Sequence, residues 1–523
     1  MKRRIGPILH LRAGKLSDWS FSVGLWIDET TAMPPTLAFD PAAKARISSL
    51  ATAAGSFDGA KWMYWLVSIP RGEKEFQTSY RIGNLDEGTI DIDGVVIPAL
   101  GQSPRIAFFS CNGVQDPKDW TTQPEMEVLW ERMHARHEAG VQPDRSGGPY
   151  HVLLGGGDQI YCDSVWADVE KLRKLDSWNA RKKARVTPSL VRALEKHYGK
   201  LYLRWHASWF SELHSRVPGL YTWDDHDIFD GWGSYSDDLQ RSGLFQAIFQ
   251  QARRAFMLFQ LGGGAEAGAP CLDASGAHFL QAIQLSDALD VVVLDLRSQR
   301  TSDAVMAEDQ WKALGDHLAA RSKRKSTGAH LLVVSTIPVV YLNFAVATTF
   351  FDWLPWRQDL EDDLRDQWEH KDHQEERSRL IMTLLNHAKE TKSRVTLLSG
   401  DVHVGARGRI ASKRPAHLIG DETESVIHQL TSSAIVFPAP PAIALAGMRS
   451  ITPSGPAPLS SVSQVETEVV GVGADHFLLG KRNWLSIEPE AAESGEREKL
   501  WVRWVTADGD VKPPLVIHAR AVR

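Results

Sequence analysis

The sequence predicts an α/β protein whose first hundred residues are rich in β-strand. Residues 1–100 contain short apolar or alternating runs separated by Gly, Pro and Asp turns, which is typical of strands. From Arg105 onward, apolar strands alternate with longer amphipathic stretches, the order found in layered α/β domains. We therefore expect a β-rich accessory domain over residues 1–100 and a larger α/β domain over residues 101–523.

Individual elements follow from these patterns. In the first domain, the strand pattern is clearest in FSVGLWI, KWMYWLVSI and GTIDIDGVVIPAL. In the second domain, helical spacing is clearest in EMEVLWERMHARHE, SLVRALEKHYGKLYLRWHASWFSELH and LFQAIFQQARRAFMLFQL. Short strand patterns return near the end of the chain in NWLSIE, LWVRWVTADG and PLVIHARAV. These last strands are expected to complete a sheet.

Three segments do not follow this alternation of strand and helix patterns. Residues 331–351 are apolar, but Pro338 and Asn343 interrupt them and they begin like a strand, so we expect buried core, with membrane contact as the alternative. Residues 352–380 predict a turn followed by a long charged helix, which is either a lid or rim over a site or a solvated helix. Residues 437–461 are rich in Pro, Gly and Ser and predict a long irregular loop.

The composition is that of an ordinary globular protein, with 43% hydrophobic and 24% charged residues among 523. The 59 Lys and Arg residues against 65 Asp and Glu residues give a net charge of −6, so no basic field favours a nucleic-acid partner. Cys111, Cys162 and Cys271 are too few for a disulfide framework and suit a reducing compartment. The N-terminal MKRRIGPILHLRAG lacks the apolar core of a secretory signal. Together these features predict a cytoplasmic protein without a transmembrane segment.

Four separated segments share one design, in which an apolar strand ends in small or turn-forming residues followed by side chains that can bind metal. The segments are RIAFFSCN with Cys111, HVLLGGGDQIYCD with Asp158 and Tyr161, LYTWDDHD with Asp225 and His226, and RVTLLSGDVHVG with Asp401 and His403. Ligand sites in open α/β sheets form beyond the carboxyl ends of the strands. We therefore expect the four strand ends to converge on one site.

Each of these segments alone also has a plain structural interpretation. Cys111 can be a small buried hydrophobic residue, Asp158 a turn residue or helix cap, and His403 a hydrogen-bonded core side chain. Asp225 and His226 can lie in a solvated turn. The recurrence of the same design at four strand ends favours a shared function over four independent structural roles.

The chemistry of the candidate side chains indicates a mixed metal site. Carboxylate and phenolate oxygens prefer hard ions, whereas imidazole nitrogen and thiolate sulfur suit transition metals, so one position could hold iron. An ion that contacts mainly carboxylates would be Ca²⁺, Mg²⁺ or Mn²⁺. Two ions bridged by one carboxylate would lie about 3.5 to 4 Å apart, a spacing that suits in-line displacement at phosphorus.

In this combination the motifs resemble those of PhoD-like alkaline phosphatases and phosphodiesterases of the metallophosphoesterase superfamily. GDQIY is similar to the GDxxY block of that superfamily, DDHD stands in the place of its GNH[DE] block, and GDVH in the place of its GHxH block. Ser-Cys-Asn replaces the usual DxH, while WDDHD, LDLRSQR and TSSAI agree with the PhoD-like group. The resemblance covers roughly residues 101–480, and it implies that residues 101–523 form an αββα catalytic sandwich beside the N-terminal β domain.

The resemblance also implies how the ligand candidates divide between two ions, with Asp158 bridging them. The residues around Fe³⁺ would be Cys111, Asp158, Tyr161 and His403, and those around a second, Ca²⁺-type ion would be Asp225 and Asp401. Mn²⁺, Mg²⁺ or Zn²⁺ are the other expected occupants of the second position. The wider superfamily has Asn where this chain has Asp225, and the additional negative charge should tighten cation binding.

Further residues would act on the substrate. His226 would stabilise phosphoryl charge or protonate the leaving oxygen, and a hydroxide activated at the bridged metal pair would attack phosphorus directly. Arg297 and Arg300 in LDLRSQR either grip phosphate or form structural pairs with carboxylates. Asp163 is interpreted as a supporting residue or a turn cap.

Three functional hypotheses follow. The preferred one is metal-dependent hydrolysis of a small phosphoric ester, with the choice between monoester and diester open. The second is a phospholipase-type phosphodiesterase acting on a phospholipid-like substrate, suggested by the apolar segments at 331–351 and 437–461. The third is a non-catalytic, metal-stabilised scaffold whose N-terminal domain binds a partner. The oligomeric state is left open.

Overall fold

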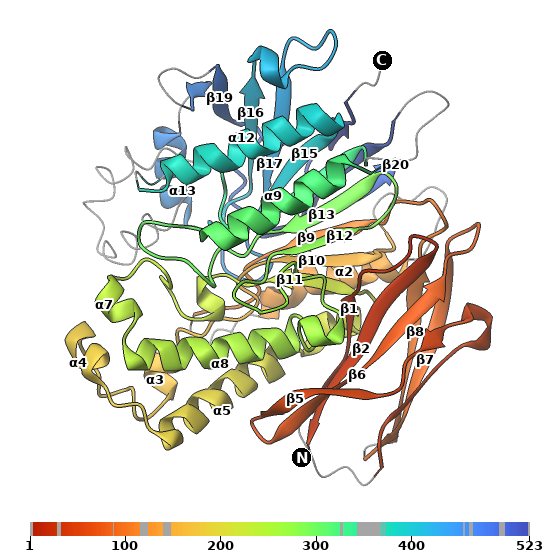
Figure 1. The fold of residues 1–523 in the computed structure, drawn as a ribbon, viewed down its shortest axis with the longest axis vertical. Coiled ribbons are helices and arrows are strands. Elements are labelled where there is room, and N and C mark those ends of the chain that lie inside the picture. Colours follow the sequence, from red (N-terminus) through yellow and green to blue (C-terminus); the bar gives the residue numbers. More distant parts are fainter. Residues whose placement is uncertain are drawn as a thin grey trace.

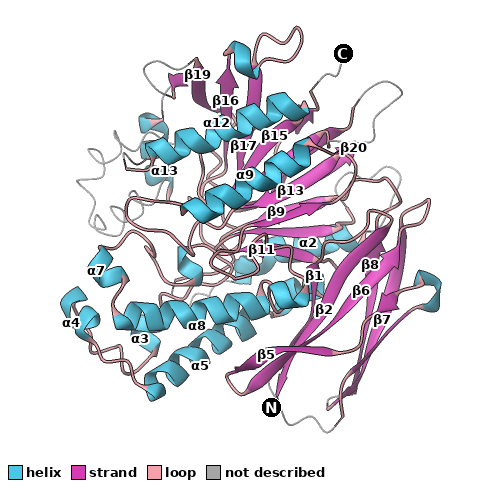
Figure 2. Cartoon of the chain, in the orientation of Figure 1, coloured by secondary structure: helices cyan, strands magenta, loops and turns pink. Residues whose placement is uncertain are grey.

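A computed structural model shows an α/β fold with two large sheets (Figures 1 and 2). The residues that it describes are 4–28, 33–86, 88–115, 124–139, 148–324, 328–341, 368, 370, 372–452, 455–459, 464–490 and 497–520.

The larger sheet carries the strands that lead to three of the four candidate segments. β9, β10 and β11 are neighbours and run parallel, so their carboxyl ends lie at one edge of the sheet. The C-terminal strand β20 pairs antiparallel with β9, which confirms that strands from the end of the chain complete the sheet. In spatial order the strands are β22 (Gly509–Asp510), β21 (Lys499–Thr506), β20 (Asn483–Glu490), β9 (Ile106–Phe109), β10 (Val152–Gly156), β11 (Gly219–Thr222), β1 (Arg4–Leu11), β2 (Asp18–Asp28), β6 (Ala60–Pro70) and β4 (Arg46–Ile47), with β23 (Leu515–His518) on β21 and β5 (Ala51–Phe57) on β6.

The second large sheet carries the fourth candidate segment at the end of β15. Its central strands β13, β14, β15 and β17 are parallel. All residues of β13 and β14 are buried, and their sequences are accordingly apolar, as in LLVV of β14. In spatial order the strands are β12 (Gln281–Gln284), β13 (Leu289–Val293), β14 (His330–Val334), β15 (Arg394–Ser399), β17 (Ser425–Thr431), β16 (Ala406–Ser412), β19 (Val465–Val470) and β18 (Ala457–Pro458).

The two large sheets pack face to face and helices cover their outer faces. Alternate residues of a strand point to opposite faces, so Leu154 of β10 packs between the sheets while Leu153 packs toward the helices. Leu332 of β14 meets the same inter-sheet core from the second sheet. The layers therefore run helix, sheet, sheet, helix, and Figure 1 shows α9 and α12 lying over the second sheet.

The helices form where the sequence places amphipathic spacing and capping residues. α5 begins after Thr187, whose side chain accepts a hydrogen bond from the backbone N–H of Leu190, and Pro188 occupies its first turn. α8 begins in the same way after Ser242 and buries one apolar face. The helices are α2 (Val128–Glu138), α3 (Val165–Asp168), α4 (Trp178–Lys183), α5 (Pro188–Trp205), α6 (Ser208–His214), α7 (Asp237–Gln240), α8 (Gly243–Phe259), α9 (Glu308–Ser322), α12 (Gln374–Thr391) and α13 (Ala442–Ile451).

The N-terminal hundred residues are β-rich, but their strands do not all form a separate sheet. β1 pairs parallel with β11 and antiparallel with β2, so β1, β2 and β6 extend the larger sheet. A third sheet is made by β3 (Thr36–Phe39), β7 (Phe76–Leu85) and β8 (Gly88–Ile97). A domain boundary near residue 100 stays a prediction.

The structure tests the predictions for the segments 331–351, 352–380 and 437–461 to different extents. Residues 437–461 were expected to form a loop, and this is wrong for Ala442–Ile451, which form α13. The preceding prolines are turn signals, but Pro441 takes the N-cap position and leaves the following Ala-rich run free to be helical. The strand expected at the start of 331–351 is β14. Residues 342–367 lie outside the described residues; they include most of the proposed lid at 352–380 and the second half of the apolar segment 331–351 on which the phospholipase hypothesis rests.

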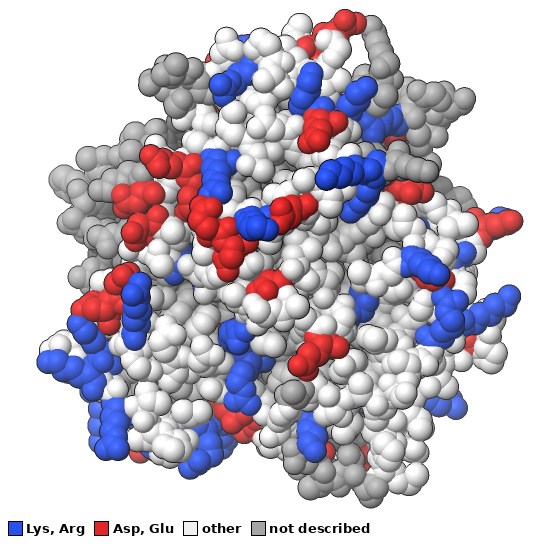
Figure 3. All heavy atoms as spheres, viewed as in Figure 1, with Lys and Arg blue, Asp and Glu red and all other residues white. Residues whose placement is uncertain are grey.

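Two surface observations bear on partners. Among the described residues, no helix has the length and apolar character needed to cross a membrane. On the face shown in Figure 3, Lys and Arg side chains are interspersed with Asp and Glu side chains, so this face is not a continuous basic surface.

Candidate metal centre

The structure brings the four candidate strand ends to one place between the two large sheets. Ser110, which follows β9, forms a parallel bridge to Ala434, which lies beyond β17 of the other sheet. Gly400, which follows β15, lies so close to Ser110 that a Cβ on the glycine would come within 2.3 Å of the serine side chain. The backbone N–H of Cys111 donates to the carbonyl of Gly157 over 3.2 Å. The sheets therefore meet at the carboxyl ends of the strands that carry the candidate ligands.

The backbone is strained at the candidate ligands themselves. Eight non-glycine residues in the described part of the chain have a positive φ, and four of them are Cys111, Asp158, Asp401 and His403, at 52°, 53°, 67° and 53°. This left-handed region costs about 1 kcal/mol or more for a residue with a side chain, and such strain concentrates at functional sites. Half of the strained positions are therefore candidate metal ligands.

The side chains meet in three overlapping groups, and in each group one potential ligand atom from every residue lies within 4.8 Å of those of the other members. The groups are Cys111 with Asp158 and His403, Asp158 with Asp225 and His226, and Asp158 with Asp224, Asp225 and Asp401. Asp158 is the member common to all three groups. A carboxylate that bridges two ions is expected to be shared between ligand groups in this way.

The first group is enclosed by aromatic rings. The Tyr161 hydroxyl lies 3.3 Å from Nε2 of His403, so the phenol joins the cysteine, aspartate and histidine of this group. The Tyr161 ring also stacks on His226, with ring centroids 4.4 Å apart. The thiol of Cys111 is 3.5 Å from Oδ2 of Asp158, to which it donates.

Burial sets the protonation of these three side chains. Burial, reinforced by the negative charge of Asp158, raises the pKa of the Cys111 thiol well above its ordinary value, and it acts in the same direction on the pKa of Tyr161. Burial also lowers the pKa of His403 to about 3, so its imidazole is neutral and can act as a ligand. A cation would have to displace the thiol and phenol protons to obtain thiolate and phenolate ligands, as metal binding to protein sites commonly does.

The second part of the centre is a set of close carboxylates. Asp158 is 1% exposed, and burial raises its pKa well above the ordinary value, with the charges of Asp224 and Asp225 acting in the same direction and His226 opposing them. Oδ1 of Asp158 is buried without a hydrogen-bond donor among the described residues. Oδ1 of Asp225 also accepts no hydrogen bond from them, although a terminal nitrogen of Arg297 lies 3.3 Å away. Close, buried carboxylates of this kind are costly unless a cation neutralises them. The donor set therefore fits metal ions.

His226 is held by a second carboxylate beside the centre. Its Nδ1 lies 2.8 Å from Oδ2 of Asp163, which identifies the supporting role of that residue. The other oxygen of Asp163 accepts the backbone N–H of Asp230 over 2.7 Å. Burial alone would lower the pKa of His226, but the charges of Asp163 and Asp225 outweigh it and raise the pKa well above 6.5. With Nδ1 engaged, Nε2 is the nitrogen available to a phosphate group.

The two candidate arginines lie in different surroundings. Arg297 is fully buried; its Nε donates to Oδ1 of Asp224, and one terminal nitrogen lies 3.3 Å from Oδ1 of Asp225. This geometry favours the structural carboxylate pair over direct contact with phosphate. The aliphatic part of Arg300 lies against Gly233, where a Cβ would come within 2.6 Å of its Cγ. Contact of Arg300 with a phosphate stays a prediction.

Sequence reasoning missed two acids of the DDHD motif. Asp224 belongs to the carboxylate group with Asp158 and Asp401, and its adjacency to Asp225 was the only available signal. Asp227 belongs to none of the ligand groups and accepts hydrogen bonds from the backbone N–H groups of Gln159 and Asp224. Burial raises the pKa of Asp227 to about 7, although these hydrogen bonds act in the opposite direction. Asp227 thus ties the GDQIY and DDHD segments together.

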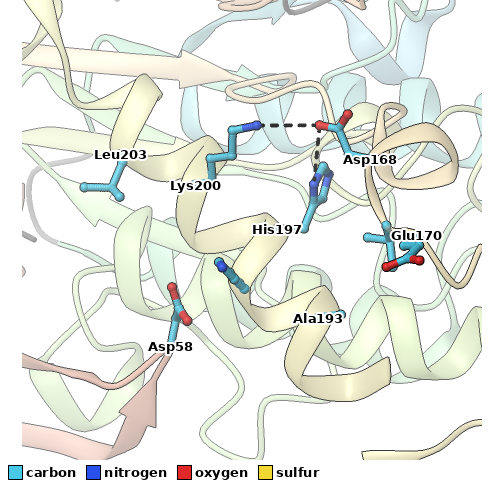
Figure 4. A pocket seen from close by; sticks show the side chains of 9 residues that line it. Asp58, Asp168, Glu170, Ala193, His197, Lys200 and Leu203 are labelled. Carbon is cyan, nitrogen blue, oxygen red and sulfur yellow. Dashed lines mark ion pairs between the residues drawn. The ribbon is translucent and has the colours of Figure 1, made fainter. Parts of the chain in front are cut away.

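A separate pocket of about 500 Å³ lies against α5 and is lined by residues that include Lys196, Lys200, Asp168 and Glu170 (Figure 4). Asp168 reaches Lys200 over 3.8 Å and His197 over 3.9 Å. None of the residues that line this pocket is a candidate ligand, so the pocket is distinct from the metal centre.

Comparison with known proteins adds two findings. A family model described as PhoD related phosphatase matches residues 128–354 and 356–452. The uncharacterized protein YGR266W of Saccharomyces cerevisiae is 25% identical over an alignment of 460 residues, and the match covers 73% of this chain and 63% of the yeast protein. This chain thus spans less than two thirds of the length of that relative. No solved structure matches the chain.

Proposed function

Because this chain belongs to the family of PhoD related phosphatases, we propose that it hydrolyses phosphoric esters at a centre of two metal ions. The observation that carries this proposal is the place of Asp158 in all three groups of potential ligands. One of these groups contains sulfur and nitrogen donors, and another contains only carboxylates. Such a division favours two ions of different character that share one carboxylate.

We assign the ions by the chemistry of the donors. Cys111, Tyr161 and His403 suit Fe³⁺, and Asp225 with Asp401 suits Ca²⁺, or Mn²⁺, Mg²⁺ or Zn²⁺ in its place. When bound, the ions would supply positive charge for the phosphoryl oxygens and lower the pKa of water. In the same proposal, the helix–sheet–sheet–helix layers correspond to the sandwich of the metallophosphoesterases, and the centre lies where the two sheets meet.

The protein's own side chains would position and neutralise the ester. Asp163 fixes the ring of His226, so that Nε2 can donate a hydrogen bond to the phosphoryl or leaving oxygen. Arg297 would act indirectly, because its guanidinium holds Asp224 and lies close to Asp225. The close packing of these groups fixes their geometry before substrate binds, which is the condition for efficient electrostatic stabilisation.

The test of the proposed function combines metal analysis with an ester panel. We expect the purified protein to contain close to one iron and one further divalent ion per chain, and to hydrolyse para-nitrophenyl phosphate, bis-para-nitrophenyl phosphate or both. The relative rates would assign the monoester or diester class. A well-folded protein that binds no metal and hydrolyses neither ester would contradict the proposal and favour a scaffold.

The role of His226 predicts a dependence on the leaving group. Replacing His226 by Gln should reduce kcat for an alkyl phosphate by about a hundredfold or more, because an alkoxide needs a proton in order to leave. The loss should be much smaller for para-nitrophenyl phosphate, whose phenolate leaves without one. Asp163→Asn should show the same pattern with a smaller loss, because it removes the charge that raises the pKa of His226 and weakens the support of its ring, but leaves the imidazole in place.

The metal content of the variant distinguishes a His226 that donates a proton from a His226 that binds a metal ion. The His226→Gln protein should retain both ions, measured by elemental analysis of the same preparation that is used for kinetics. Equal losses on both esters, or loss of an ion, would make His226 a charge-stabilising residue or a ligand instead of a proton donor.

A further inference from the structure

Phe437 lies directly against the proposed iron side of the centre and has no role in the mechanism described above. Its ring stacks on His403 with centroids 4.0 Å apart and on Tyr161 with centroids 5.3 Å apart. The buried residues of the same small apolar cluster are Cys111, Tyr161 and Ala434. Phe437 is the partly exposed member of this cluster, so part of its ring faces out of the centre.

Both proposed ligands lie on one face of the Phe437 ring. The Tyr161 and His403 rings are tilted by only 22° and 21° from the plane of Phe437. Rings stacked on opposite faces would be separated by about 7 Å, twice an ordinary contact distance. The Tyr161 hydroxyl and Nε2 of His403 are only 3.3 Å apart, which excludes that arrangement. The other face of Phe437 therefore points away from both ligands.

The backbone fixes Phe437 relative to the centre. The N–H groups of Val436 and Phe437 both donate to the carbonyl of Cys111, over 3.3 and 3.2 Å. The N–H of Ile435 donates to the carbonyl of Ser110 over 3.0 Å. Because Cys111 is itself a proposed ligand, these bonds fix the backbone of Phe437 beside the centre.

The chain that follows Phe437 is apolar and partly exposed. We call residues 437–448 the apolar rim; it contains no charged residue and includes most of α13. Ile443 in the first turn of α13 is 84% exposed, the highest exposure among the large hydrophobic residues that the structure describes. Exposed apolar surface of this kind is typical of a binding site, and the chain leads into it directly from Phe437.

From this juxtaposition we propose that Phe437 determines substrate specificity by receiving the organic group of the ester on its outward face, and that the preferred substrates are phosphoric esters of aromatic or similarly flat, apolar alcohols. This inference rests on the proposed function. The phosphate would lie among the ligands and His226, while the alcohol part would extend past Phe437 toward the apolar rim. An aromatic face in such a position gains both buried apolar area and stacking energy.

The test compares two phosphate monoesters, 1-naphthyl phosphate and glycerol phosphate, in wild type and in Phe437→Ala. We expect the ratio of kcat/KM for the naphthyl ester to that for the glycerol ester to fall about tenfold, within the range found for losing an apolar group from a specificity pocket. The change should lie mainly in KM, because the contact exists before the transition state. Phe437→Leu, which keeps apolar volume without a flat face, should give a smaller fall and serves if the alanine variant does not fold.

A matched control is Phe76→Leu in β7, at another partly buried phenylalanine, which packs against the core between the sheets and not against the cluster of Phe437 or the apolar rim. Its selectivity ratio should equal that of the wild type. If both esters lose activity equally in the Phe437 variants, or if their iron content falls, the residue only supports the His403 ring and the inference is overturned. A wild-type protein that hydrolyses neither ester nor the para-nitrophenyl esters would overturn the proposed function as well.

Discussion

Replacement of Asp158 by Asn is expected to abolish hydrolysis, with a fall in kcat/KM of at least about a thousandfold. Asp158 belongs to every group of potential ligands, so the change removes one negative charge from both proposed ion positions. An amide oxygen is a weaker ligand than a carboxylate and bridges two ions poorly. Elemental analysis of the variant should show loss of at least one of the two ions.

The same substitution should not destabilise the metal-free protein. Burial and the neighbouring carboxylates Asp224 and Asp225 already disfavour the charged form of Asp158, and a neutral amide of the same shape removes that cost. In the presence of a chelator, the Tm of Asp158→Asn should therefore equal or exceed that of the wild type. With metal added, the order should reverse, because only the wild type gains binding energy.

The control for Asp158→Asn is the same substitution at an acid outside the metal centre. Asp168→Asn changes an acid on α3 that lines the separate pocket, and it should keep the activity and metal content of the wild type. If Asp158→Asn retains full activity, the two-metal proposal is wrong. If it unfolds both with and without metal, the cluster has a structural role that favours the scaffold hypothesis.

Replacement of Asp227 by Ala is expected to lower the free energy of unfolding by about 3 kcal/mol or more. Asp227 is 1% exposed and accepts hydrogen bonds from the backbone N–H groups of Gln159, Ile160 and Asp224 over 3.1, 3.2 and 2.9 Å. It also accepts one from the side chain of Gln260 over 2.9 Å. Alanine would leave these buried donors unpaired and would open a small cavity.

Urea unfolding of wild type, Asp227→Ala and Asp227→Asn measures this effect. Asn keeps one acceptor oxygen and should lose clearly less stability than Ala. A loss below about 1 kcal/mol for Asp227→Ala would show that water or backbone movement replaces the lost acceptor. Because Asp227 joins the segments that carry Asp158 and Asp225, metal affinity should fall together with stability.

Much of the site was predictable because the ends of buried strands can be recognised in a sequence. An apolar run followed by small residues marks the end of a buried strand, and this rule correctly located the ends of β9, β10, β11 and β15. The residue types after those ends then indicate the chemistry, since a thiol, a phenol, imidazoles and carboxylates are rarely gathered without a metal. The family assignment from these motifs agrees with the family to which the chain belongs.

Other features were not predictable because they depend on contacts between distant segments. Arg297 was a candidate for phosphate binding, and only the folded chain shows its guanidinium against Asp224 and Asp225. The residues of α13 were assigned to an irregular loop, because proline is a turn signal whether or not a helix follows it. Asp227 has no sequence feature that distinguishes it from the other acids of its motif.

The sequence by itself determined the strand and helix patterns, the residues available for chemistry and the family. These properties reside in local periodicity and in side-chain type, which a single chain displays without folding. Tertiary structure decided which acids meet at Asp158, that β1, β2 and β6 extend the larger sheet, and that Phe437 stacks on His403. These outcomes arise from packing two sheets on a common core, where the neighbours of a residue are set by the whole fold and not by its position in the chain.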